Sequence, residues 1–166
     1  MQLPDNAASK PRSLRIKAAS DFDRWRMECP RFGRPVSVVR LARVFGYGRL
    51  DPAAGDVQLF DSPRKNSRPY GVKIAADGSV SAACNGANCL LRVDTETLEV
   101  SEIPLAQAGT TVRRLDIDGD GIIWWANSEL GRLGRYDPVT GDIQEWDSPS
   151  GPNSHPYAIA VFDDAV

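Results

Sequence analysis

Short runs of alternating apolar and polar residues, separated by turns rich in Asp, Gly and Pro, fill most of the chain after residue 45. In residues 131–149, for example, two such runs flank the segment Asp-Pro-Val-Thr-Gly. Alternation with a period of two is typical of half-buried β-strands, and turns of this composition join antiparallel neighbours. The pattern therefore predicts a series of β-hairpins and an all-β fold.

The hairpins recur at a fixed spacing of 43 residues, as Arg49, Arg92 and Arg135 show at the start of equivalent runs. A second phrase, Arg-Pro-Tyr-Gly at residue 68, has related copies near residues 111 and 155. Joining the two phrases gives one unit of four antiparallel strands, expected near residues 70–75, 80–84, 90–94 and 98–103. A last strand is expected to open after residue 155.

Four antiparallel strands that recur with a period in the low forties are typical of β-propeller blades. A lone blade leaves both of its apolar faces exposed, so blades stack side by side. The 166 residues hold about three blades, whereas closed propellers have about four to eight. We therefore predict an all-β fold, an incomplete β-propeller of four-stranded antiparallel blades with a 43-residue repeat. Residues 45–166 would form it, with blades at about 68–105 and 111–149 flanked by part-blades.

Residues 1–44 contain neither repeated phrase and are basic, with ten Lys and Arg against four Asp and Glu. Two interpretations stay open for this N-terminal extension. It is either a flexible or partly helical segment whose stretch "PVSVVRLARVF" is recruited as a strand, or sequence from an altered coding frame that replaced earlier blades. The basic residues are scattered and little interleaved with aromatic residues, which argues against a nucleic-acid partner.

The composition, 42% hydrophobic and 25% charged, is that of a globular protein. We find neither the apolar core of a secretory signal nor a run of about 18 apolar residues, so we expect a cytoplasmic protein without a membrane partner. Three cysteines fit a reducing compartment. Cys84 and Cys89 should face one another across a hairpin, and we expect thiols there rather than a disulfide.

Two further motifs have structural interpretations. The stretch "DIDGDG" at residues 116–121 resembles the start of a calcium loop, but the twelfth position is Asn127, and the repeat aligns the stretch with an ordinary Asp-Gly turn at residue 78. Trp124 and Trp125 are adjacent on a predicted strand, so they should point to opposite faces of their blade.

The phrases "RPYGVKIAADGSV", "GRLGRYDPVTGDIQEW" and "HPYAIAV" resemble blades of the virginiamycin B lyase (streptogramin lyase) family. The resemblance covers roughly residues 46–166 and implies a seven-bladed propeller fold. It also implies a Mg²⁺-assisted elimination that opens a cyclic antibiotic at its ester. In such an elimination a His takes the proton next to the carbonyl, and a Glu-held cation stabilises the developing charge.

The family's blade pattern places His after the Pro of the first strand and Glu at the end of the second. The first position is occupied here by Tyr70, Arg113 and Tyr157, and the second by Cys84 and Asn127. Phenols and guanidiniums are protonated at neutral pH, and a thiol and an amide are poor Mg²⁺ ligands. His155 and Glu129, each two residues from an expected position, are weak catalytic candidates. We therefore expect no metal and no cofactor.

The leading hypothesis is a lyase-like propeller fragment that lacks the catalytic His and Glu set and acts at most as a binding or interaction module. Arg113, Tyr70 and Tyr157 would bind an anionic small ligand at the channel mouth. The alternative is an active Mg²⁺-dependent carbon–oxygen lyase that linearises streptogramin B antibiotics and gives antibiotic resistance. A truncated product without function also stays open. The open blade faces predict self-association.

Overall fold

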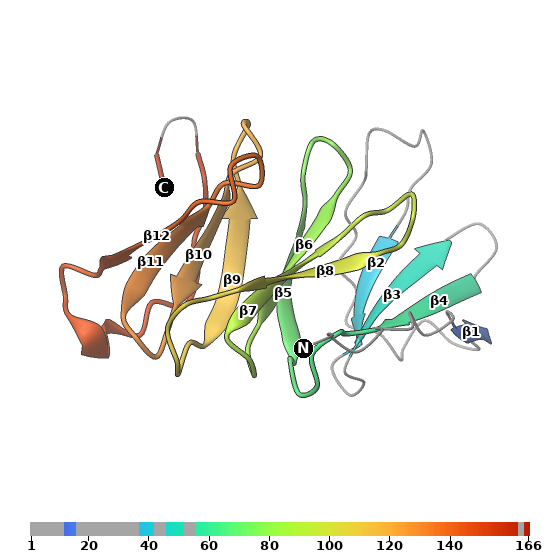
Figure 1. The fold of residues 1–166 in the computed structure, drawn as a ribbon, viewed down its shortest axis with the longest axis horizontal. Helices are drawn as coiled ribbons and strands as arrows, with labels where there is room; N and C mark the ends of the chain where they lie inside the picture. The colour runs from blue at the N-terminus through green and yellow to red at the C-terminus, as the bar shows by residue number, and fades with distance from the viewer. Residues whose placement is uncertain (1–11, 16–36, 42–45, 52–55, 163–164) are drawn as a thin grey trace, which may run out of the picture.

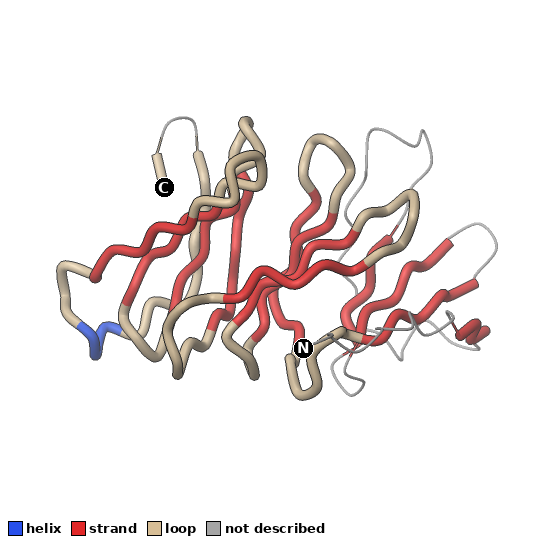
Figure 2. Tube along the Cα trace, in the orientation of Figure 1, coloured by secondary structure: helices blue, strands red, loops and turns tan. Residues whose placement is uncertain are grey.

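The computed structural model describes residues 12–15, 37–41, 46–51, 56–162 and 165–166. Within them, twelve β-strands form three antiparallel sheets of four strands each, which lie side by side (Figure 1). Strands and their connecting turns make up almost all of the described chain (Figure 2). The expected all-β partial propeller is confirmed.

The middle and last sheets correspond to the two predicted blades. The middle sheet consists, in spatial order, of β5 (Pro69–Ile74), β6 (Val80–Cys84), β7 (Cys89–Val93) and β8 (Val100–Pro104). The last sheet consists of β9 (Val112–Ile117), β10 (Ile123–Asn127), β11 (Arg132–Tyr136) and β12 (Ile143–Asp147). Each is a simple meander, as the alternation predicts.

The turns after β5 and β9 have the same geometry. The amide of Gly78 donates to the carbonyl of Ala75 at 2.9 Å, and the amide of Gly121 donates to that of Asp118 at 3.1 Å. Both glycines have positive φ, 86° and 83°, which a residue with a Cβ adopts at a cost. Residues 116–121 therefore end a strand and form a hairpin turn, in agreement with the turn interpretation.

The first sheet contains strands from before residue 45. Here β2 (Ser37–Leu41) pairs with β3 (Gly46–Asp51), and β1 (Arg12–Arg15) pairs with the outer side of β4 (Asp56–Asp61). β2 lies 43 residues before β6, so it takes the place of a second strand. The segment "PVSVVRLARVF" thus contributes a strand. Most of the extension lies outside the described residues, and its boundary after residue 44 stays a prediction.

Among the described residues, two apolar clusters lie on the two faces of the middle sheet. The cluster between the middle and last sheets includes Leu90, Val112 and Trp125, and the cluster on the opposite face includes Leu91 and Val93. Trp125 is fully buried and lies across from Gly134 on the next strand. A Cβ at Gly134 would overlap the Trp125 indole. This glycine therefore provides the space for the largest core side chain.

The last segment does not form the strand that was expected after residue 155. A single 3₁₀ turn, η3 (Pro152–Ser154), precedes it, and the Val161 amide donates to the Asp116 carboxylate at 3.0 Å. A strand needs a hydrogen-bonded neighbour, and none of the described residues forms the second strand of a further sheet. The described residues also include no helix long and apolar enough to cross a membrane.

Candidate functional site

The strands β5 and β9 form the inner edges of their sheets and lie against one another. Their closeness depends on Gly71. A Cβ at Gly71 would lie 2.7 Å from the carbonyl oxygen of Arg113 and 3.1 Å from the Cα of Arg114. The absence of a side chain here brings Tyr70, the neighbour of Gly71, beside the two arginines.

Tyr70, Arg113, Arg114 and Tyr157 meet in a group that we call the Tyr–Arg cluster. The hydroxyls of Tyr70 and Tyr157 are 2.6 Å apart, and their rings meet edge to face with centroids 6.4 Å apart. The Arg114 guanidinium lies over the Tyr70 ring at 5.2 Å, and that of Arg113 over the Tyr157 ring at 5.6 Å. Both distances suit cation–π attraction. The structure thus joins the three predicted ligand-binding residues and adds Arg114.

The cluster favours negative charge. The hydrogen bond from Tyr70 lowers the pKa of Tyr157, and a hydrogen bond from Arg114 and the charges of both guanidiniums act in the same direction. Each of these interactions stabilises the phenolate relative to the phenol. Because 48% of the Tyr157 surface is exposed, the cluster is open to solutes. It can therefore offer donors and positive charge to an anion from solution.

The residues around the cluster fix the position of Tyr157. Lys73 and Asp116 form an ion pair at 2.9 Å, and the other oxygen of Asp116 accepts from the amide of Val161 at 3.0 Å. The hydroxyl of Ser128 donates to the carbonyl of Pro156 at 2.6 Å. These two contacts, one on each side of Tyr157, tie the last segment to β9 and to the turn after β10.

His155 and Glu129 do not join the cluster. His155 lies with Nδ1 3.0 Å from the carbonyl oxygen of Ser128, and Glu129 is exposed in the turn after β10. In the described part of the chain, neither side chain forms a hydrogen bond or ion pair with the Tyr–Arg cluster. Their roles as catalytic candidates stay untested predictions.

Cys84 and Asn127, which stand at the expected Glu positions, are fully buried. Oδ1 of Asn127 accepts from the amides of Thr111 at 3.2 Å and Leu130 at 3.4 Å. Cys84 and Cys89 are both free thiols, and a hydrogen bond with Cys89 together with burial raises the pKa of Cys84. Both positions are therefore part of the interior of their blades.

Neither the Tyr–Arg cluster nor the pair of Cys84 and Asn127 has side chains that suit a magnesium ion. No three His, Cys, Asp or Glu side chains within the described ranges are placed to hold a metal together. Mg²⁺ prefers oxygen ligands, carboxylates above all, and the cluster instead places the guanidiniums of Arg113 and Arg114 beside two tyrosines. Positive charge at that place opposes a cation.

Comparison with solved structures identifies the architecture. No protein-family model and no curated protein matches the sequence. Virginiamycin B lyase from Staphylococcus aureus is similar in structure, with a TM-score of 0.77 and 18% identity, over 94% of this chain and 51% of the lyase chain. The fold is that of part of a virginiamycin B lyase propeller. This confirms, for the fold, the resemblance seen in the repeated phrases.

Two other lyase structures resemble this virginiamycin B lyase-like propeller. A streptogramin B lyase has a TM-score of 0.76 and 23% identity over 90% of this chain and 48% of its own. A catalytically inactive virginiamycin B lyase from Staphylococcus aureus with quinupristin has a TM-score of 0.64 and 21% identity, over 76% and 45% of the chains. The chain thus spans about half the length of the lyases it resembles.

One residue of the site, Arg114, was not among the predicted ligand-binding residues. Arg114 follows Arg113 directly, and alternation along a strand would have placed its side chain on the opposite face. Its contact with the Tyr70 ring arises because β5 approaches β9 closely at Gly71. The glycine after Tyr70 was the available signal, since glycine in a strand often marks a close approach of two backbones.

Proposed function

We propose that this virginiamycin B lyase-like propeller binds a small organic anion at the Tyr–Arg cluster and does not open streptogramin rings. The observation that carries the proposal is the meeting of Arg113, Arg114 and two hydrogen-bonded tyrosines at the inner strands. Guanidiniums recognise carboxylates and phosphates through paired donors. The site therefore has the chemistry of an anion-binding site.

The surrounding charges support an anion as the ligand. The nearby carboxylate of Asp116 is already paired with Lys73, and Arg113 forms no ion pair with any residue that the structure describes. The guanidinium of Arg113 is thus available to a ligand carboxylate. The rings of Tyr70 and Tyr157 add apolar surface, which favours an anion with an aromatic body. Benzoate is accordingly the simplest probe.

The same residues argue against elimination chemistry. Arg113 and the two tyrosines stand where the resemblance implies the base, and the residues do not fit the metal. Loss of a general base alone typically costs about 10²–10⁴-fold in rate. A catalytically inactive lyase of this fold is known with quinupristin, so quinupristin is a suitable second probe for binding without turnover.

Isothermal titration with benzoate tests the proposal. Arg113→Gln removes one charge-assisted hydrogen bond, so we expect affinity to fall about ten- to hundred-fold. Arg132→Gln is the matched control, because Arg132 pairs with Asp147 on the outer strands at 2.7 Å and should leave affinity unchanged. No binding by the wild-type chain, or equal loss in both variants, would overturn the proposal. Circular dichroism verifies that each variant is folded.

A further inference from the structure

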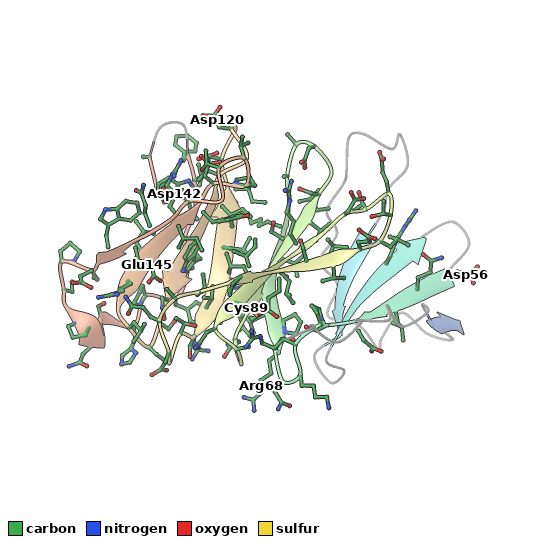
Figure 3. The ribbon with its side chains drawn as sticks, in the orientation of Figure 1. Asp56, Arg68, Cys89, Asp120, Asp142 and Glu145 are labelled. Atoms are coloured by element: carbon green, nitrogen blue, oxygen red, sulfur yellow. The ribbon has the colours of Figure 1, made fainter. Side chains whose placement is uncertain are left out.

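A cavity of about 240 Å³ lies between the middle and last sheets. It opens among the turns that follow β5, β9 and β11. The Tyr–Arg cluster lies at the other end of β5 and β9, and Figure 3 shows Arg68 and Asp120 at these opposite ends. The lining of the cavity includes Ala75, Asp77, Ser81, Arg92, Ile117 and Ile123. The cavity is therefore separate from the proposed anion site.

The internal repeat explains why there is a cavity. Ser81 is the equivalent of Trp124 one blade later, because each faces an arginine across its hairpin, Arg92 and Arg135 respectively. Trp124 stacks on Trp146 with ring centroids 6.2 Å apart. An indole on this face of the last sheet is thus replaced by a hydroxyl on the same face of the middle sheet.

The hydrogen-bond partner of the indole is also replaced. Trp124 Nε1 donates to the carboxylate of Asp118 at 2.8 Å, and the residue equivalent to Asp118 in the middle sheet is Ala75. Both substitutions shorten a side chain, and both Ala75 and Ser81 line the cavity. The cavity therefore lies where the middle sheet lacks the indole and the carboxylate that the last sheet has at the equivalent positions.

Ser81, a residue that lines the cavity, also points to a ligand through its hydroxyl. Its side chain is almost completely buried, with 1% exposed, and its hydroxyl has no hydrogen-bond partner among the described residues. Buried polar groups are nearly always hydrogen-bonded. A molecule in the cavity that carries a donor or acceptor would satisfy this hydroxyl.

We propose that the cavity binds a small, flat heteroaromatic molecule no larger than an indole, whose ring N–H donates to Ser81 Oγ. Ile117 and Ile123 provide apolar wall, and a volume below the roughly 300 Å³ of drug-sized sites limits the ligand to one or two rings. Arg92 is paired with Asp77 at 2.9 Å, whereas the exposed carboxylate of Asp120 at the opening forms no ion pair with any residue in the described part of the chain. The cavity therefore disfavours anions, unlike the Tyr–Arg cluster.

Titration of the ¹⁵N-labelled chain with indole tests this site by chemical-shift mapping. We expect saturable shifts at the amides of Ser81, Arg92 and Ile123. Ser81→Ala keeps the cavity but removes the acceptor, so the affinity should fall about two- to ten-fold. Ser81→Trp introduces the indole that Trp124 provides at the equivalent position one blade later, so it should fill the cavity and abolish the shifts while the chain stays folded.

Benzoate titration of Ser81→Trp separates this inference from the proposed function, because filling the cavity should leave anion binding at the Tyr–Arg cluster unchanged. Indole shifts that persist in Ser81→Trp, or that are absent from the wild-type chain, would overturn the inference. If Ser81→Trp does not fold, Ser81→Ala decides alone, and an unchanged indole affinity would then count against the site.

Discussion

Replacement of Gly71 by Ala tests whether the close approach of β5 and β9 assembles the Tyr–Arg cluster. The new Cβ would lie 2.7 Å from the Arg113 carbonyl oxygen and 3.1 Å from the Arg114 Cα. Both are backbone atoms, which cannot rotate away as a side chain can. Since non-bonded heavy atoms prefer about 3.5 Å or more, the two strands would have to separate by roughly 0.8 Å.

The expected cost follows from this overlap. Extra methyl groups in packed positions typically cost about 1–3 kcal/mol. For a chain of this length, each kcal/mol lowers the midpoint of thermal unfolding by roughly 2–4 °C, so a decrease of about 2–12 °C is expected. Separation of the strands should also move Arg113 and Arg114 away from the tyrosine rings and weaken benzoate binding.

Urea unfolding followed by tryptophan fluorescence measures the change in unfolding free energy. Gly119→Ala is the matched control, because a Cβ there meets nothing within 4 Å and its φ is not in the left-handed region. Its unfolding free energy should stay within about 0.5 kcal/mol of wild type. If Gly71→Ala and Gly119→Ala unfold at the same urea concentration, the close approach at Gly71 does not constrain the two strands.

Three further predictions concern a turn, a titration and an open sheet face. Leu98 has a φ of 64°, and the equivalent residue of the next blade is Gly141 with a φ of 77°. Leu98→Gly should relieve left-handed backbone strain of about 1–2 kcal/mol, partly offset by the greater entropy of the unfolded chain. A lower midpoint of thermal unfolding would contradict this prediction. The phenolate of Tyr157 should appear in a 295 nm titration below the usual pKa of about 10, and Tyr70→Phe should move it upward because Tyr70 donates the main hydrogen bond. Since the pKa of Tyr157 is lower in the folded state, ionised Tyr157 should stabilise the folded chain above pH 10, and this stabilisation should be lost as the pH falls through the folded-state pKa. If the unfolding free energy of Tyr157→Phe depends on pH as that of the wild-type chain does, the titrating group is not Tyr157. Trp146 is 44% exposed and stacked on Trp124, so the outer face of the last sheet should support self-association, which light scattering should detect and Trp146→Glu should reduce; a monodisperse wild-type monomer would be the opposite result.

The sequence predicted what depends on local pattern. Alternation and the Asp-Gly turns located all eight strands of the middle and last sheets, because a hairpin is specified by residues close together in the chain. Trp124 and Trp125 were correctly assigned to opposite faces for the same reason. The equivalence of Tyr70, Arg113 and Tyr157 also followed from the repeat alone.

Features that depend on contacts between distant segments were not predicted. The strand expected after residue 155 does not form, because pairing requires a neighbour that alternation within one segment cannot show. The stacking of Arg114 on Tyr70 depends on how closely two blades approach. The cavity could have been suspected from the sequence, since the repeat aligns Ser81 with Trp124. Only the packing of the two sheets, however, shows that no other side chain fills the space.

We propose that this chain has part of the lyase propeller fold without the elimination chemistry of the lyases. Mass spectrometry of quinupristin incubated with the purified chain and Mg²⁺ tests it most directly, with the chain omitted as the blank. We predict that the antibiotic stays cyclic, at the level of the blank, because Tyr70, Arg113 and Tyr157 stand at the positions where the resemblance implies an imidazole base, and Cys84 and Asn127 are buried. Linear product that accumulates with time would contradict this proposal. If that product were then lost in His155→Ala, His155 would be the base.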